Sequence, residues 1–250
     1  MTHVLTYFAL PGRGLVARVC FGAAGVPYTN KIVSFPEFKD MKPTLPLGQL
    51  PILTLPSGRV VCQSGAIARY AATLAHLNGN SPEETLLIDE VVTCADELMN
   101  KCASLCMRRV ARDQGKRGGA ALQVPRKRLA RSPARRGAFS RRALTAAPIR
   151  PRVPQLPDAE AKKAARLAFA ADAMPKWLAL LQDRLGAGPF YGGASLNLAD
   201  LTVFAVTGSI CKGQWDYIDA DAALGPFPAL RAHHDAVKAH PLVVDHAVYL

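Results

Sequence analysis

The amino-acid sequence predicts a small α/β domain followed by an all-helical domain. Residues 3–78 alternate short β-rich runs with stretches of helical periodicity, as expected for a sheet covered by helices. From Ser81 onward apolar residues recur only at helical spacing, apart from a basic segment at residues 107–154 that has no such periodicity. We therefore expect one domain at 1–79 and a second at 80–250, which the basic segment interrupts.

The first domain is predicted to have the element order β-α-β-(short α or loop)-β-β-α. One helix is expected within residues 12–26, where Gly25 ends it. Another is expected over residues 64–79, with Ser64 as its cap and with Ile67, Tyr70 and Leu74 on one face. The predicted strands lie in four β-rich runs: residues 3–8, 28–35, 50–55 and 59–62.

The second domain is predicted to begin with a long helix. Ser81, Pro82 and Glu84 have the spacing of a capping box with proline at the first helical position. The apolar stripe that follows is expected to comprise Leu87, Val91, Ala95, Leu98 and Cys102.

Three further helices are expected after the basic segment. Residues 158–186 predict a helix with a kink at Pro175 and an inward face of Leu167, Met174, Leu178, Leu181 and Leu185. Asn197 and Asp200 have cap and N3 spacing, and Leu196 and Leu201 are placed to form a hydrophobic staple. The last helix is predicted over residues 227–240.

The net charge of +12 belongs to one segment. Residues 107–154 contain 15 Lys or Arg and one Asp, which leaves 16 basic and 18 acidic residues elsewhere, a net charge of −2. This segment is rich in Arg, Ala, Pro and Gly and cannot bury enough apolar surface to offset its ordering entropy, so we expect a disordered insertion. A translated GC-rich intron would have the same composition.

The composition of the whole chain excludes several classes of protein. Half of the residues are hydrophobic and a fifth are charged, which is typical of a globular protein. No apolar run reaches membrane-spanning length, and no signal peptide is visible. The six cysteines have no CxxC or zinc-like spacing, so we expect no metal site and a reducing, cytoplasmic location.

Three features of the first domain could serve one ligand. Tyr7 ends the first predicted strand, directly before a loop and helix. Pro51 follows Leu50 ahead of a strand, where a cis peptide would expose the Leu50 backbone. Gln63 and Ser64 begin a helix, whose free N–H groups and dipole favour a carboxylate.

These motifs resemble those of the cytosolic glutathione S-transferases, especially the sigma class. The resemblance is carried by "LTYF" followed by Gly12-Arg13, by "TLPLGQLPIL", by "QSGAIARYAA" and, in the helical part, by "SLNLADLTVF". It covers nearly all of the chain outside 107–154. It implies an α+β protein with a thioredoxin-like N-terminal domain followed by an all-α C-terminal helical bundle domain, in a homodimer.

The resemblance also implies roles for individual residues. Tyr7 would be catalytic, because its hydroxyl would favour the thiolate of glutathione. Asp96 or Glu97 would reach the partner subunit's glutathione, although either could be solvated helix surface. Phe38 stands where the family usually has tryptophan, and Arg13 could instead form a structural ion pair. The implied glutathione-binding set is Arg13, Phe38, Lys42, Gln49, Leu50, Pro51, Gln63 and Ser64, and the implied electrophile pocket has Phe8, Gly12 and Met99 as walls.

The leading functional hypothesis is therefore conjugation of glutathione to small hydrophobic electrophiles. Related alternatives are a glutathione-dependent prostaglandin isomerase and a non-catalytic, crystallin-like protein on the same fold. Nucleic-acid binding by residues 107–154 is a further alternative, but Phe139 is the segment's only aromatic residue, which argues against a stacking platform. His233, His234, His240 and His246 show no partner pattern and are interpreted as surface or packing residues.

Overall fold

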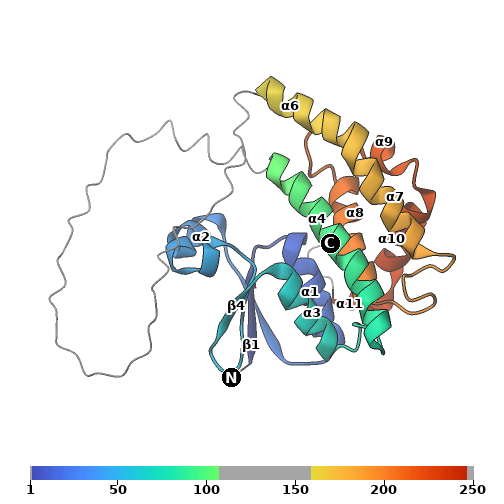
Figure 1. The fold of residues 1–250 in the computed structure, drawn as a ribbon. Coiled ribbons are helices and arrows are strands. Elements are labelled where there is room, and N and C mark those ends of the chain that lie inside the picture. Colours follow the sequence, from blue (N-terminus) through green and yellow to red (C-terminus); the bar gives the residue numbers. More distant parts are fainter. Residues whose placement is uncertain (1, 107–158, 247–250) are drawn as a thin grey trace, which may run out of the picture.

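The computed structural model describes residues 2–106 and 159–246, and the predicted insertion at 107–154 lies outside the described residues. Within that part, a four-stranded sheet with helices packed on it is followed by a helical bundle (Figure 1). None of the described helices combines the length and apolarity that a membrane crossing needs.

The sheet has the strand order β2-β1-β3-β4, with β1 at His3–Tyr7, β2 at Tyr28–Ile32, β3 at Ile52–Thr54 and β4 at Val60–Cys62. β1 pairs in parallel with β2 and antiparallel with β3, and β3 pairs antiparallel with β4. A parallel pair needs a crossover, which α1 (Leu15–Ala23) supplies. α3 (Ser64–Leu74) packs beside α1 (Figure 1). The predicted order of strands and helices is confirmed.

The segment between β2 and β3 forms a short helix, one of the two predicted options. α2 (Phe35–Met41) begins with a capping box: Ser34 Oγ accepts from the Glu37 N–H at 3.4 Å, and the Glu37 carboxylate accepts from the Ser34 N–H at 2.7 Å. Two 3-10 turns, Lys42–Thr44 and Pro46–Gly48, then lead towards β3.

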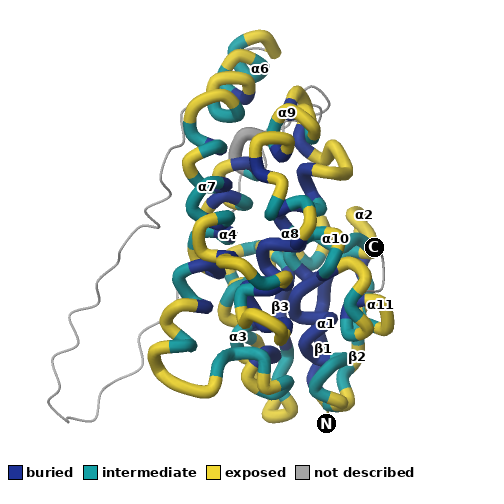
Figure 2. The backbone as a smooth tube through the Cα atoms, turned by 90° about the vertical axis from the view of Figure 1, so that its right-hand side faces the viewer, coloured by how far each residue is buried: buried dark blue, intermediate teal, exposed yellow. Residues whose placement is uncertain are grey.

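The helical part is built around α8 (Leu198–Cys211), which is buried along most of its length (Figure 2). A helix buried on most of its surface needs neighbours around it, and α4 (Pro82–Cys106) and α10 (Pro228–Ala239) pack against α8. The other helices among the described residues of this part are α6 (Ala159–Ala168), α7 (Met174–Leu185), α9 (Ala220–Leu224) and α11 (Pro241–His246). The sequence did not predict α9 and α11, which are only five and six residues long.

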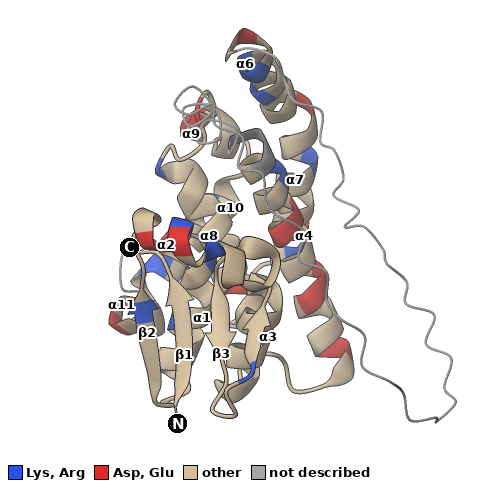
Figure 3. Ribbon diagram, turned by 90° about the vertical axis from the view of Figure 1, so that its left-hand side faces the viewer, with Lys and Arg blue, Asp and Glu red and all other residues tan. Residues whose placement is uncertain are grey.

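The predicted apolar stripe of α4 is wrong at its first residue. Leu87 is 56% exposed, whereas Ile88 is buried with Val91, Ala95, Leu98 and Cys102. One residue rotates a side chain by about 100° around a helix axis, so Leu87 and Ile88 face different surroundings. Acidic side chains also follow one another along α4 (Figure 3): Glu83, Glu84, Asp89, Glu90, Asp96 and Glu97.

The predicted inward face of the next helices is wrong at Leu167, which is 46% exposed, and right from Met174 to Leu185. A π-helical turn at Phe169–Ala173 separates α6 from α7, directly before the predicted kink at Pro175. A π turn takes more residues than an α turn, so it shifts the rotation of α6 relative to α7. Arg166 is the residue of α6 that points inward, and it bonds to Asp216 at 2.9 Å.

Helix caps follow the predictions in part. Ser81 Oγ accepts from the Glu84 N–H at 3.1 Å, but the Glu84 carboxylate accepts from the Asn80 N–H rather than from Ser81. The predicted box at α8 is complete, because Asn197 Oδ1 accepts from the Asp200 N–H and Asp200 Oδ2 accepts from the Asn197 N–H. Leu196 and Leu201 are both buried in the core.

His233 has a polar partner that the sequence did not reveal. It is buried, and its Nε2 donates to Asp200 Oδ1 at 2.9 Å, while the Tyr191 N–H donates to the same oxygen at 2.8 Å. The interpretation of His233 as a surface or packing residue is therefore incomplete. The carboxylate of Asp200 thus connects the backbone of Tyr191 with the side chain of His233.

His234 makes the stability of the fold depend on pH. Burial lowers the pKa of His234 to about 4; the nearby charge of Asp235 opposes this fall, and smaller electrostatic effects of Lys238, His233 and Lys212 add to it. Its Nδ1 lies 2.8 Å from Thr207 Oγ1. Between about pH 4 and about pH 6.5 the unfolded chain binds a proton at this side chain that the folded chain does not. We expect the free energy of unfolding to fall as pH is lowered through this window.

The measurement is urea unfolding at a series of pH values. The variant His234→Gln should have a smaller pH slope in this window, and His76→Gln, at an exposed histidine, should keep the slope of the parent. Equal slopes in the parent protein and in His234→Gln would contradict the prediction.

Candidate functional site

Tyr7 lies at the end of β1 in the α/β part. The side chain is only 7% exposed, and its hydroxyl oxygen accepts a hydrogen bond from the Arg13 N–H at 3.1 Å. Among the described residues, no acceptor takes the hydrogen of this hydroxyl. Burial raises the pKa of Tyr7, although the Arg13 N–H and the charges of Arg13 and Arg18 oppose the rise. Tyr7 is thus a protonated hydroxyl with a hydrogen to donate.

Two glycines allow the chain after β1 to fold back onto the Tyr7 ring. A Cβ at Gly12, where φ is +40°, would lie 2.7 Å from the Tyr7 hydroxyl oxygen. A Cβ at Gly14 would lie 2.5 Å from Tyr7 Cδ1. Both distances are shorter than carbon and oxygen atoms tolerate, so the absence of a side chain is what permits the Arg13 N–H to reach Tyr7.

The Leu50–Pro51 peptide is cis, as the sequence analysis anticipated. It directly precedes β3, whose first residue, Ile52, pairs with Thr6 next to Tyr7. In the described part of the chain, neither the N–H nor the C=O of Leu50 has a hydrogen-bonding partner. An unpaired peptide therefore lies beside the strand end that carries Tyr7.

The N-terminus of α3 is open to a ligand. Ser64 is the first helical residue rather than the predicted cap, and Gln63, with φ of 80°, precedes the helix. No side chain accepts from the first N–H groups of this helix. Free N–H groups at the start of an eleven-residue helix favour an anion.

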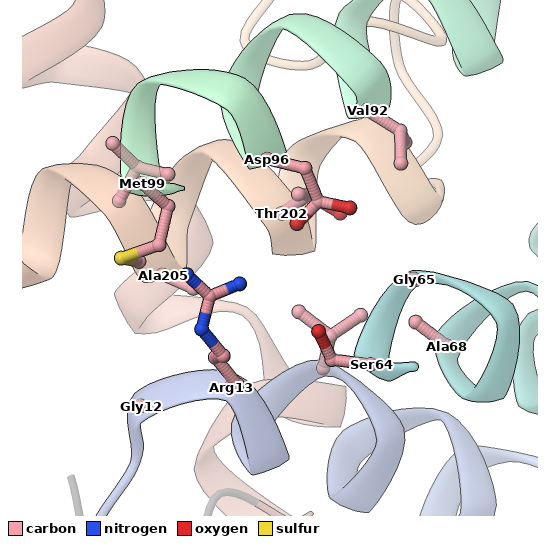
Figure 4. A pocket seen from close by; sticks show the side chains of 12 residues that line it. Gly12, Arg13, Ser64, Gly65, Ala68, Val92, Asp96, Met99, Thr202 and Ala205 are labelled. Carbon is pink, nitrogen blue, oxygen red and sulfur yellow. The ribbon is translucent and has the colours of Figure 1, made fainter. Parts of the chain in front are cut away.

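A cleft lies between the α/β part and the helical part (Figure 4); Tyr7, Leu50, Pro51 and Gln63 are not among the residues that line it. Gly12, Arg13 and Ser64 line one side, and Asp96 and Met99 of α4 line the other. Further lining residues were not predicted from the sequence: Val16, Gly65, Ala68, Val92, Thr202, Ala205 and Val206. The three from α8 lie more than a hundred positions from Ser64, and no local pattern indicates such a pairing.

Two family profiles match the two parts of this chain. The profile "Glutathione S-transferase, N-terminal domain" matches residues 3–73, and the profile "Glutathione S-transferase, C-terminal domain" matches residues 151–247. The chain belongs to the glutathione S-transferase family. The predicted fold class, a thioredoxin-like domain followed by a helical domain, is confirmed.

Relatives within the family are named as glutathione S-transferases or as prostaglandin D synthases. The chain is 40% identical to hematopoietic prostaglandin D synthase of Gallus gallus over 97 residues, which is 39% of this chain and 48% of that protein. It is 42% identical to glutathione S-transferase 3 of Caenorhabditis elegans over 93 residues, 37% of this chain and 44% of that protein. The chain thus spans about half the length of these curated relatives.

Solved structures show the same fold over nearly the whole chain. The glutathione S-transferase from Ascaris lumbricoides superimposes with a TM-score of 0.66 and 24% identity, covering 98% of this chain and 95% of that one. Prostaglandin synthase D of Nilaparvata lugens superimposes with a TM-score of 0.68 and 19% identity, covering 98% and 96%. At these identities the likeness establishes the fold alone.

The sequence did not indicate which of Asp96 and Glu97 would reach the partner subunit's glutathione. The two side chains lie in different surroundings. Asp96 lines the cleft, and its carboxylate oxygen is 2.8 Å from the position of a Cβ on Gly65 (Figure 4). Burial raises the pKa of Asp96, while the charges of Arg13 and Arg69 oppose the rise. Glu97, in contrast, is exposed. Of these two acids, Asp96 lines the cleft and Glu97 does not.

Phe8 and Lys42 contact aromatic residues of α2, whereas Arg13 lines the cleft. Phe8 does not line the cleft and instead stacks on Phe35, with ring centroids 4.7 Å apart, and meets Phe38 edge-on at 5.2 Å. Lys42 Nζ is 5.6 Å from the Phe38 ring centroid, and Gln49 is exposed. Arg13 bonds to a neutral amide, with Nη2 donating to Asn100 Oδ1 at 2.8 Å.

Among the described residues, no group of three or more His, Cys, Asp or Glu side chains is arranged to hold a metal ion.

Proposed function

We propose that this protein is a glutathione transferase that attacks small hydrophobic electrophiles with a thiolate held by Tyr7. The observation that carries the proposal is the Tyr7 hydroxyl, whose oxygen accepts from the Arg13 N–H and whose own hydrogen has no acceptor among the described residues. A hydroxyl that donates to a sulfur stabilises the thiolate over the thiol and so lowers the pKa of the thiol. The thiolate is the nucleophile.

The remaining glutathione contacts are assigned to groups with free hydrogen-bonding capacity. The γ-glutamyl carboxylate is proposed to bind Gln63 and the N–H groups at the start of α3. The unpaired Leu50 peptide, ahead of Pro51, is proposed to bind the cysteinyl backbone, and Lys42 and Gln49 the glycyl end. Phe38 offers no N–H to the glycyl end, in contrast to a tryptophan.

The proposed reaction is a displacement or addition at an electrophilic carbon. In a displacement, the glutathione sulfur forms a bond to that carbon and the leaving group departs with its electron pair. In an addition, the sulfur forms the same bond and the electron pair of the attacked double bond takes up a proton. In both cases the thiol proton passes to solvent when the thiolate forms. Gly12 and Met99 line the cleft and are proposed as walls for the electrophile, with Arg13 beside them. Phe8 is proposed to hold α2 against this end of the site rather than to contact the electrophile in the cleft.

The family resemblance implies a homodimer, in which an acid of each subunit reaches the partner's glutathione. The role is proposed for Asp96 or Glu97: Asp96 lies near the start of α3 of its own chain, and Glu97 is exposed. A cytoplasmic location accords with the proposal, since the cytosol maintains a pool of reduced glutathione.

A glutathione-dependent prostaglandin isomerase is the second candidate. The match to the Gallus gallus enzyme named hematopoietic prostaglandin D synthase favours it. Both candidates use the same thiolate, so they differ only in the second substrate. A non-catalytic protein is the third, because S-crystallin 3 of Enteroctopus dofleini is 31% identical over 99 residues, 40% of this chain and 46% of that protein.

The proposal is tested by turnover with glutathione and a generic aromatic electrophile, beside a parallel assay with a prostaglandin endoperoxide. Conjugation of the aromatic electrophile supports the transferase, and turnover of the endoperoxide alone supports the isomerase. If the protein binds glutathione in calorimetry and turns over neither substrate, the non-catalytic alternative replaces the proposal.

A further inference from the structure

Arg18 is a buried cation that the functional site does not otherwise use. It lies in the middle of α1 and is 0% exposed, one of two arginines among the largest fully buried side chains of the described residues. A guanidinium is costly to remove from water unless its N–H groups find good acceptors. The acceptors that Arg18 has found therefore indicate what the side chain holds in place.

Two of these acceptors are carbonyl groups of the segment that follows Tyr7. Arg18 Nη2 donates to the Phe8 C=O at 2.8 Å, and Arg18 Nη1 donates to the Leu10 C=O at 2.7 Å. A third bond runs from Arg18 Nε to Asn30 Oδ1 on β2 at 3.2 Å. The planar fork of a guanidinium fixes the directions of all three bonds, so it fixes the path of residues 8–10 relative to β2.

The same segment determines where the Tyr7 hydroxyl points. It leads within a few residues to Arg13, whose N–H donates to the Tyr7 oxygen, and the Arg18 guanidinium carbon lies 5.5 Å from the centroid of the Tyr7 ring. Gly14 is in contact with both side chains, because a Cβ there would lie 3.3 Å from Arg18 Nη1 and 2.5 Å from the ring. Arg18, the turn and the ring thus form one packed unit.

We propose that Arg18 is a positioning residue for Tyr7: by clamping the carbonyl groups of Phe8 and Leu10, it holds the Arg13 N–H and the Tyr7 hydroxyl in the orientation that stabilises a thiolate. The inference rests on the proposed function and adds a residue that the sequence analysis did not select. The charge of Arg18 also favours the thiolate. A cation beside the ring lowers the pKa of Tyr7, which makes its hydroxyl a stronger hydrogen-bond donor.

The test is the pKa of the thiol of bound glutathione, measured by the ultraviolet absorbance of the thiolate across a pH series. The variant Arg18→Lys keeps the charge, but one ammonium cannot reproduce the fork that reaches both carbonyl groups. We expect this variant to raise the thiol pKa by about 1 unit and to lower kcat about tenfold. KM for glutathione should change by less than about twofold, because the proposed carboxylate contacts lie on α3.

Two controls separate positioning from general loss of stability. Asn30→Ala removes only the Nε bond and should leave the thiol pKa within about 0.3 units of the parent value. In a Tyr7→Phe background, Arg18→Lys should cause no further rise of the thiol pKa, because Arg18 acts through the hydroxyl that is absent. If Arg18→Lys fails to fold, Arg18→Gln is the second variant, and it should likewise raise the thiol pKa and lower kcat.

An unchanged thiol pKa in a folded Arg18 variant, or an equal shift with and without the Tyr7 hydroxyl, would overturn the inference. The parent protein tests the proposed function separately. If its bound thiol ionises no more readily than that of free glutathione, the proposed function fails before Arg18 is considered.

Discussion

Replacement of Tyr7 by phenylalanine is expected to lower kcat/KM for glutathione conjugation by roughly 10²–10³-fold, the usual loss when one preorganised donor is removed from a developing anion. The ring of phenylalanine fills the same space against Gly12 and Gly14, so the fold should be retained. The variant loses the proposed hydrogen bond to the sulfur together with the bond that the Tyr7 oxygen accepts from the Arg13 N–H. Initial rates with a generic electrophile, and the ultraviolet absorbance of the bound thiolate, measure the effect.

Tyr217→Phe is the matched control. Tyr217 is 51% exposed, on the turn between α8 and α9 and outside the cleft, so its replacement should leave the rate unchanged. A Tyr7→Phe variant with the parent rate and the parent thiolate signal would exclude Tyr7 as the group that activates glutathione. The proposed mechanism would then need another donor.

Replacement of Asp200 by alanine is expected to lower the free energy of unfolding by about 3–5 kcal/mol, the typical loss when one partner of a buried charged network is removed. Its carboxylate is fully buried and accepts from the N–H groups of Tyr191 and Asn197 and from His233 Nε2. All three donors would be left without an acceptor inside the central helix packing. Urea unfolding at neutral pH measures the change.

Asp183→Ala is the matched control, because Asp183 is exposed on α7 and its loss should cost less than about 0.5 kcal/mol. Asp200→Asn should fall between the two, since an amide oxygen still accepts but the amide nitrogen adds donors where only donors surround it. If Asp200→Ala were no less stable than Asp183→Ala, the network would have no structural importance.

Much of the fold could be predicted from local pattern. The order of strands and helices in residues 3–78 follows from period-2 and helical spacing interrupted by glycine and proline, and the capping box of Asn197 and Asp200 follows from residue type and spacing. The errors also have a local cause. Leu87 and Leu167 are apolar at helical spacing, but both are exposed. In α4 the buried stripe begins one residue later, at Ile88, and the π turn after α6 changes the rotation of α6 relative to α7.

The candidate site could be predicted where a single element carries the signal. Tyr7 at a strand end, the cis Leu50–Pro51 peptide and the start of α3 at Gln63 and Ser64 each belong to one segment, and the structure gathers them at one side of the sheet. Phe8, predicted as a wall of the electrophile pocket, stacks on Phe35 and meets Phe38 edge-on, contacts with α2 that no local pattern indicates.

The sequence by itself therefore determined the elements, the fold class and the three motifs around Tyr7, because hydrophobic period, turn residues and helix caps act over a few neighbouring positions. Only the tertiary structure decided that Asp96 rather than Glu97 faces the cleft, that α8 completes its wall, and that Arg18 lies buried against the Tyr7 ring. These outcomes depend on how helices are rotated and packed against distant segments. A rotation of about 100° per residue changes which side chain meets a neighbour without changing the local pattern.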